Sequence, residues 1–191
     1  TTMHDMLAQD TEVLCVKGSG WDLGNIEPPG LPAVRLGPIR QLSALSALSD
    51  EEMVNAQRIN LLNASAPNPS VETLLHAFLP HKFVDHTHAN AVLSLTDQEN
   101  GDDICRAVFG DRMGYVPYIM PGFALAKKSK EIFEQNTNVE GLILFKHGIF
   151  SFGETAQASY ERMIEMVSLA ETEIGKRRSR IFPSIEIPGQ L

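Results

Sequence analysis

The spacing of apolar and polar positions changes several times along the chain, and each change marks an expected element. Short apolar runs bounded by glycine, proline or polar residues predict strands at residues 12–17, 34–36, 82–88, 141–146 and 147–152. Apolar residues at helical spacing predict helices over residues 49–62, 71–79, 124–135 and 154–178. Strands and helices alternate without internal repeats, which favours one mixed α/β domain built in layers.

Two of the predicted helices carry start signals. Ser49 followed by Glu52 has the spacing of a capping box. Ser70 is expected to cap the next helix, which Pro80 ends, so Glu72 lies in its first turn. A carboxylate in that position has a plain structural role, because it complements the helix dipole.

Composition and charge limit the classes of partner. The 191 residues carry a formal net charge of -8 with one short basic run at 176–178, which argues against nucleic acid or an anionic membrane as a partner. Cys15 and Cys105 form neither a disulfide framework nor a Cys-x-x-Cys motif, so a reducing, cytoplasmic setting is expected. We also expect a soluble protein, because no apolar run reaches the roughly 20 residues of a membrane helix.

A pair of histidines in the predicted strand 82–88 suggests a metal site. Residues i and i+2 of a strand point to the same face, so His86 and His88 can converge on one ion. A catalytic zinc usually keeps three protein ligands. His147 is the best third candidate, because Gly148 lets the chain turn there toward a neighbouring strand. The alternative is a chance pair among six histidines, each satisfied by ordinary hydrogen bonds.

Other residues gain a functional interpretation only beside such a metal. Glu72 would then serve as a general base within reach of a metal-bound substrate. An anionic group would be held by free N–H groups at the Ser70 helix start and at residues 18–20, with Lys17 adding charge. Without the metal, a glycine turn and a capping serine are more often structural.

Several segments follow one another in an informative order. They are Lys17-Gly18-Ser19-Gly20, Pro69-Ser70-Val71-Glu72, residues 85–91, Val116-Pro117-Tyr118 with Gly122, and Lys146-His147-Gly148. In this order the chain resembles the class II aldolase/adducin family from about Val13 to Ala170. The resemblance implies an α/β fold, a three-layer α-β-α domain with a central mixed, largely antiparallel sheet. We expect residues 1–191 to form one such domain, with 176–191 as a C-terminal tail.

The resemblance also implies roles for individual residues. His86, His88 and His147 correspond to the ligands of a divalent metal, usually zinc, that binds the carbonyl and hydroxyl oxygens of a ketose phosphate. Glu72 corresponds to the acid/base carboxylate. Tyr118 corresponds to a tyrosine that reaches in from a neighbouring subunit of a homotetramer and protonates the aldehyde oxygen. The phosphate side maps to Ser19, Gly20 and Ser70.

Within the family, the chain is most similar to the aldolase portion of bifunctional rhamnulose-1-phosphate aldolase/short-chain dehydrogenase proteins. This implies retro-aldol cleavage to dihydroxyacetone phosphate and an aldehyde, with the metal stabilising an enediolate and Glu72 carrying a proton. A site that raises the pKa of Glu72 would suit that role. No Gly-x-Gly-x-x-Gly motif follows a strand, so the dehydrogenase part is expected outside this chain. The family's Gly-Asn-x-Ser phosphate loop is also missing, which predicts a truncated N-terminus.

Three alternatives remain open from the sequence. A sugar-phosphate epimerase or dehydratase would use the same metal ligands. A non-catalytic adducin-like assembly domain would not need the three histidines and Glu72 together. A Schiff-base aldolase would need a buried lysine of lowered pKa, for which Lys17 and Lys146 are the candidates.

Overall fold

The computed structural model describes residues 1–177 and centres on a four-stranded sheet. Its strands lie in the order β4-β7-β6-β5, with the bounds β4 Phe83–Thr87, β5 Met113–Val116, β6 Gly141–Leu144 and β7 Gly148–Gly153. Strand β7 runs antiparallel to both β4 and β6, whereas β5 and β6 are parallel. The predicted mixed, largely antiparallel sheet is therefore confirmed.

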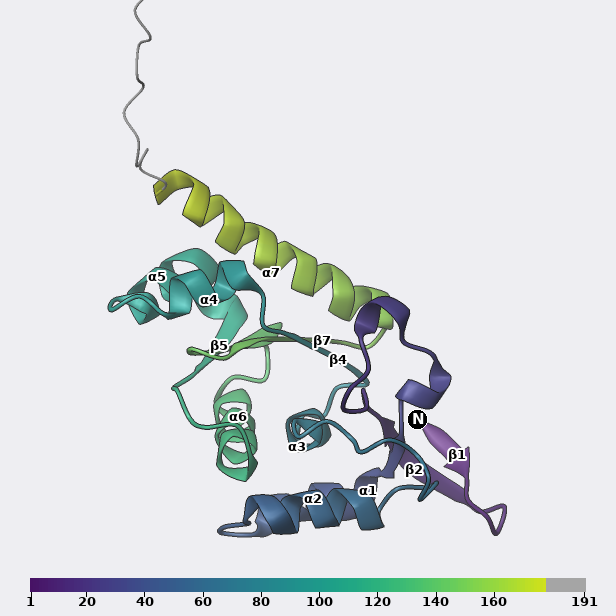
Figure 1. Cartoon of the computed structure of the whole chain (residues 1–191). Helices are drawn as coiled ribbons and strands as arrows, with labels where there is room; N and C mark the ends of the chain where they lie inside the picture. Colours follow the sequence, from purple (N-terminus) through teal and green to yellow (C-terminus); the bar gives the residue numbers. More distant parts are fainter. Residues whose placement is uncertain (178–191) are drawn as a thin grey trace, which may run out of the picture.

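Helices cover both faces of this sheet (Figure 1). One face carries α4 (Asn90–Thr96), α5 (Gly101–Phe109) and α7 (Ala156–Arg177). The other carries α3 (Thr73–Phe78) and α6 (Phe123–Gln135), with α1 (Leu36–Gln41) packed against α3. The three-layer α-β-α arrangement is confirmed. Helix α2 (Asp50–Ile59) starts at the capping box predicted at Ser49.

The two inner strands of the sheet, β6 and β7, are buried along their whole length because both of their faces are covered. Leu142 and Phe150 belong to the hydrophobic cluster on the α3 and α6 side. Ile143 and Ile149 belong to the cluster under α4, α5 and α7. All four side chains are fully buried, and burial of each contributes roughly 1.5–3 kcal/mol. This packing fixes the position of the sheet edge at which His86, His88 and His147 occur.

A smaller antiparallel sheet lies beside the main domain layers (Figure 1). It contains β1 (Thr2–His4), β2 (Asp10–Cys15) and β3 (Ala33–Arg35), in the order β1-β2-β3. Short 3-10 helices occur at Leu23–Asn25, Pro28–Gly30, Leu42–Ala44 and Gly110–Arg112. Cys15 is exposed and Cys105 is buried, and both are free thiols.

The long helix α7 buries part of the face that the spacing predicts. Met163 and Ala170 are buried as expected, but Tyr160 is 62% exposed, while Ser159 beside it is fully buried. The reason is a pair of buried hydrogen bonds, because the hydroxyls of Ser159 and Ser151 each donate to the other residue's carbonyl. Of the predicted tail 176–191, the first two residues belong to α7, and 178–191 lie outside the described residues. Within residues 1–177, no helix combines the length and apolar character that crossing a membrane demands.

Arg112 joins the sheet to α7, and we expect its loss to destabilise the fold. Its guanidinium donates to both carboxylate oxygens of Glu140, at 2.9 and 2.7 Å, and to both of Glu165, at 2.7 and 2.9 Å. Arg112→Met is expected to lower the free energy of unfolding by about 1–2 kcal/mol at pH 7. Arg106→Met, which breaks an exposed pair with Asp102 within one helix, should cost less than about 0.5 kcal/mol.

The effect of Arg112→Met should depend on pH in a defined direction. Hydrogen bonds from Arg112 hold the pKa of Glu140 and of Glu165 below their usual value of 4.5. Carboxylates with a lowered pKa stabilise the fold above that value and lose the contribution as pH falls through the lowered pKa. In urea unfolding, the difference in the free energy of unfolding between wild type and variant should therefore become smaller below about pH 4. A difference that is constant with pH would assign the effect to packing of the arginine stem instead.

Candidate metal centre

Three histidines meet at one edge of the central sheet. Strands β4 and β6 are both antiparallel to β7, so their carboxyl ends lie at the same edge. His86 and His88 occur at the end of β4, and His147 lies between the end of β6 and the start of β7 at Gly148. The ring centroids of the three imidazoles are 4.8 to 5.2 Å apart. The structure thus brings together the histidines that the sequence singles out.

The carboxylate of Glu72 lies among these rings. Its Oε1 atom is 2.8 Å from Nε2 of His147, 3.1 Å from Nε2 of His86 and 3.8 Å from Nε2 of His88. The four possible ligand atoms all lie within 4.8 Å of one another. The side chains of His86 and His147 are almost fully buried, whereas that of His88 is 58% exposed. The cluster is therefore open to solvent on the His88 side.

The hydrogen bonding of His86 makes the cluster suitable for a cation. Its Nδ1 atom lies 3.0 Å from the carbonyl oxygen of Ile149, so Nδ1 carries the proton and donates it. In the neutral ring, Nε2 then directs a lone pair toward the Glu72 oxygen and has no hydrogen-bond partner among the described residues. A lone pair facing a carboxylate oxygen is repulsive unless a proton or a metal ion lies between them. In proteins, a histidine that binds a metal through one ring nitrogen commonly donates a hydrogen bond from the other nitrogen to a backbone carbonyl, as Nδ1 of His86 does.

The charge states of the cluster also fit a divalent metal. Burial alone would raise the pKa of Glu72, but the contacts of its carboxylate with the His147 and His86 rings outweigh burial and hold that pKa well below its usual range. The expected raised pKa of Glu72 is therefore wrong. Burial, followed by the charges of His86 and His147, lowers the pKa of His88 and keeps its ring neutral. Neutral imidazoles and an ionised carboxylate are the forms that bind zinc and similar metals.

Gly148 allows the two strands to approach at this cluster. A Cβ atom there would lie 2.5 Å from the carbonyl oxygen of Thr87, 3.0 Å from Cδ2 of His88 and 3.1 Å from Cε1 of His86. Gly148→Ala is expected to displace both rings, to destabilise the fold by roughly 1–3 kcal/mol and to weaken metal binding at least about tenfold. Gly37→Ala, where a Cβ meets no atom within 4 Å, should change neither quantity. Competition with a chelator measures the metal affinity, and urea unfolding measures the free energy of unfolding. Unchanged metal affinity in Gly148→Ala would contradict the assignment of His86 and His88 as metal ligands.

The helix that follows Glu72 starts later than the sequence predicts. Helix α3 begins at Thr73, and Glu72 itself occupies the N-cap position without a side-chain cap. The Ser70 hydroxyl accepts from the amide of Glu72 at 3.2 Å, and the Thr73 hydroxyl donates back to the Ser70 carbonyl. Ser70 therefore stabilises a tight turn before the helix. That turn leaves the Glu72 carboxylate free to contact the histidines.

The predicted phosphate-side segments lie side by side, but most of their amides are already used. The amide of Ser19 donates to Asn68, and that of Ser70 donates to the Lys17 carbonyl. The Ser19 hydroxyl lies 3.4 Å from the carbonyl of Pro69. The expected cradle of free N–H groups is therefore wrong for Ser19 and Ser70. What remains for a ligand is their two hydroxyls and the amides of Gly20, which has a φ of +85°, and of Val71. Neither amide has a partner among the described residues.

Tyr118 lies in a different surface feature. It is 53% exposed, and its hydroxyl lies 3.0 Å from the sulfur of Met120. It lines a pocket of about 530 Å³ together with Phe145 and Lys146, next to His147 in the chain. Lys146 itself has a φ of +58°. The role of Tyr118 at a neighbouring subunit stays a prediction.

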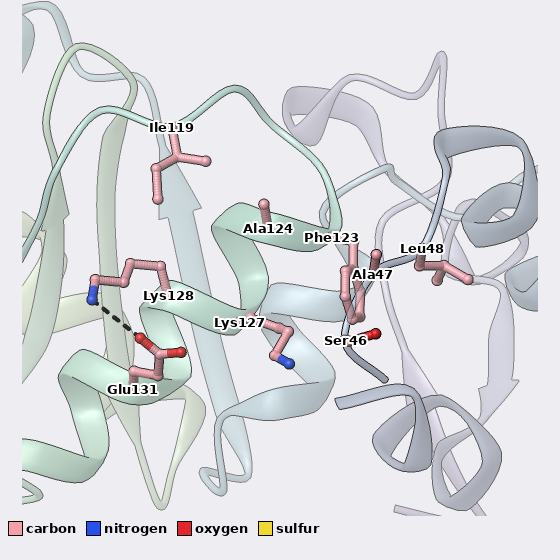
Figure 2. Close-up of a pocket in the computed structure, with 9 residues that line it drawn as sticks. All are labelled: Ser46, Ala47, Leu48, Ile119, Phe123, Ala124, Lys127, Lys128 and Glu131. Atoms are coloured by element: carbon pink, nitrogen blue, oxygen red, sulfur yellow. Dashed lines mark hydrogen bonds and ion pairs between the residues drawn. The ribbon is translucent and has the colours of Figure 1, made fainter. Parts of the chain in front are cut away.

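Another pocket, of about 410 Å³, is lined by residues 46–48, Ile119 and helix α6. Figure 2 shows its lining residues, among them Phe123 and the charged side chains of Lys127, Lys128 and Glu131. Lys127 donates to the carbonyl of Leu45 at 2.6 Å, and Lys128 pairs with Glu131 at 3.1 Å. Both ammonium groups are thus satisfied within the chain, and none of the predicted site residues lines this pocket.

Comparison with known proteins places this site in a family. The sequence matches the Class II Aldolase and Adducin N-terminal domain over residues 3–174, and the chain belongs to that family. Among solved structures, the N-terminal class II aldolase domain of a conserved protein from Thermoplasma acidophilum is 40% identical, with a TM-score of 0.86 over 91% of this chain and 80% of that one. A sugar-phosphate aldolase from Thermotoga maritima, 19% identical over 63% of this chain and 60% of that one, shares the fold with a TM-score of 0.51.

A curated relative is much longer than this chain. The protein named "Uncharacterized oxidoreductase YuxG" of Bacillus subtilis is 39% identical over 177 residues, which make up 93% of this chain. The chain spans only 26% of the length of that relative. The match therefore concerns one part of a larger protein.

Proposed function

We propose that this domain is the catalytic part of a metal-dependent lyase that cleaves a ketose 1-phosphate of the rhamnulose type. The products would be dihydroxyacetone phosphate and an aldehyde. The observation that carries the proposal is the arrangement of three imidazole Nε2 atoms around one oxygen of Glu72. Family membership over residues 3–174 supports the same chemistry.

The proposed metal ligands are His86, His88 and His147, with zinc as the expected ion. Three imidazoles with an adjacent carboxylate suit zinc, and a catalytic site of this kind keeps a further position for substrate. A bound divalent cation supplies a Lewis acid that stabilises negative charge on the substrate oxygens. The exposed side of His88 gives substrate access to the cluster.

Glu72 is proposed to carry the proton of the reaction. In cleavage, the bond between C3 and C4 of the ketose breaks, and its electron pair stays on C3. Glu72, which takes up a proton from solvent before cleavage, delivers it to C3. The proton of the C4 hydroxyl is released to solvent through Tyr118 of a neighbouring subunit as the aldehyde forms, so one proton is taken up and one is released per turnover. In condensation, the ionised Glu72 removes the proton from that carbon instead. A lowered pKa keeps the Glu72 carboxylate ionised, so that it can accept this proton.

The remaining parts of the proposal concern the substrate phosphate and the assembly. Ser19, Gly20 and Ser70 would hold the phosphate through two hydroxyls and the amide of Gly20, which has no partner within residues 1–177. We also propose a cytoplasmic homotetramer whose full-length chain carries a short-chain dehydrogenase domain. The longer relative named as an oxidoreductase supports that last point.

Product analysis tests the proposed reaction. The zinc-supplied protein is expected to release dihydroxyacetone phosphate from rhamnulose 1-phosphate, to lose this activity with a chelator, and to form no borohydride-trapped adduct. Interconversion of ribulose phosphates without cleavage would identify an epimerase on the same site. Activity that survives chelation together with a trapped adduct would support the Schiff-base alternative and contradict the proposal.

A further inference from the structure

Strand β7 carries two buried phenylalanines that each stack on a histidine. The ring of Phe150 lies 4.1 Å from that of His86, with 16° between their planes. The ring of Phe152 lies 4.5 Å from that of His81, with 3° between their planes. Both phenylalanines are fully buried in the same hydrophobic cluster. The two pairs are near copies, but only the first contains a member of the metal cluster.

Two consecutive residues of β7 therefore hold the His86 imidazole. The β4–β7 register places Phe150 directly opposite His86, and the ring stack sets the plane of the imidazole. The carbonyl of Ile149 accepts from Nδ1 and sets which nitrogen faces the cluster. Together these contacts direct Nε2 toward Oε1 of Glu72 at 3.1 Å.

Phe150 is in turn held by the helix that follows Glu72. His76 of α3 contacts the Phe150 ring edge-on, with centroids 5.5 Å apart and planes at 63°. The amide of His76 donates to the backbone carbonyl of Glu72 at 3.2 Å. The contacts from His76 through Phe150 to His86 thus join the segment that carries the carboxylate to the strand that carries the imidazoles.

We propose that Phe150 is a positioning residue for the metal ligand His86. The stacked Phe150 ring holds the imidazole in its ligating orientation, and His76 holds the Phe150 ring in place through its edge contact. A ligand already held in orientation loses little rotational freedom on binding, so the affinity for the ion rises. The inference rests on the proposed metal site. It concerns side chains that touch neither the ion nor the substrate, and it therefore predicts an effect on affinity rather than on proton transfer.

The near copy at Phe152 supplies the matched control. Zinc affinity is measured by competition with a chromophoric chelator for wild type, Phe150→Leu and Phe152→Leu, and urea unfolding is measured for each. Both substitutions remove a fully buried ring from the same strand, so both should destabilise the fold to a similar degree. Phe150→Leu is expected to weaken zinc binding roughly 10–100-fold, while Phe152→Leu leaves it unchanged.

The outcomes separate this inference from the proposed function. Equal affinities in the two variants would overturn the positioning role, because general loosening of the core would then explain any loss. A wild-type protein that binds no zinc would overturn the metal site itself. If Phe150→Leu does not fold, His76→Leu tests the same role. This variant keeps the Phe150 ring but removes the side chain that contacts it, and it is expected to weaken zinc binding several-fold. Unchanged affinity in His76→Leu would then count against the role.

Discussion

Replacement of His86 by alanine is expected to abolish stoichiometric zinc binding and, with it, the proposed cleavage of ketose phosphate. His86 provides the most firmly oriented of the three imidazole groups, through its bond to Ile149 and its stack on Phe150, and its side chain is almost fully buried. Removing a group that hydrogen-bonds to a metal ligand typically weakens metal binding roughly 10–100-fold. Removing the ligand itself should weaken binding more. Two imidazoles and one carboxylate would remain, with one of those imidazoles largely in solvent.

Metal analysis of the dialysed, zinc-supplied protein tests this expectation. His4→Ala is the matched control, because His4 is exposed and pairs with Asp10 outside the cluster. Wild type and His4→Ala should retain about one zinc per chain, and His86→Ala should retain none. Unfolding curves show whether the variant is folded. A folded His86→Ala protein that holds zinc as tightly as wild type would contradict the assignment of the ligands.

The histidine cluster is the part of the site that sequence reasoning reaches most directly. The side-chain period of two in a strand places His86 and His88 on one face without any knowledge of the fold. The position of His147 follows from its glycine neighbour only once β6 and β7 are known to form a hairpin beside β4. The residues that hold His86 are less accessible to this reasoning, because Ile149 contributes a backbone carbonyl and Phe150 resembles any core residue.

Elements that form only through contacts with distant parts of the chain were not predicted from the sequence. Strand β5 has only four residues, one of them Gly114, and it exists because it pairs with β6 and packs on α6. Strand preference of this kind reflects packing more than local sequence. The same holds for the phosphate side, where amides expected to be free are used in bonds between segments about 50 residues apart, from Ser19 to Asn68 and from Ser70 to Lys17.

Replacement of Glu72 by glutamine is expected to separate metal binding from catalysis. The amide has nearly the shape of the carboxylate and keeps an oxygen near His147, but it has no negative charge and cannot accept a proton from carbon. Loss of a general acid–base group typically lowers the rate by roughly 10²–10⁴-fold. The three imidazoles remain, so the variant should still bind about one zinc per chain, although more weakly than wild type. This pattern differs from that of His86→Ala, which should lose both properties.

Hydrogen exchange at the substrate carbon tests the role of Glu72 without the aldehyde. In D₂O, the wild-type protein with zinc should catalyse deuterium incorporation into dihydroxyacetone phosphate, which NMR detects, because the ionised carboxylate removes a proton from the carbon that forms the new bond. Glu72→Gln should lose this exchange to the same extent as cleavage, since both require the same proton transfer. Glu72→Asp keeps the charge but shortens the side chain, and an intermediate rate is expected. Exchange at the wild-type rate in Glu72→Gln would show that another group carries the proton, and the catalytic assignment would then have to move from Glu72 to a group such as Tyr118.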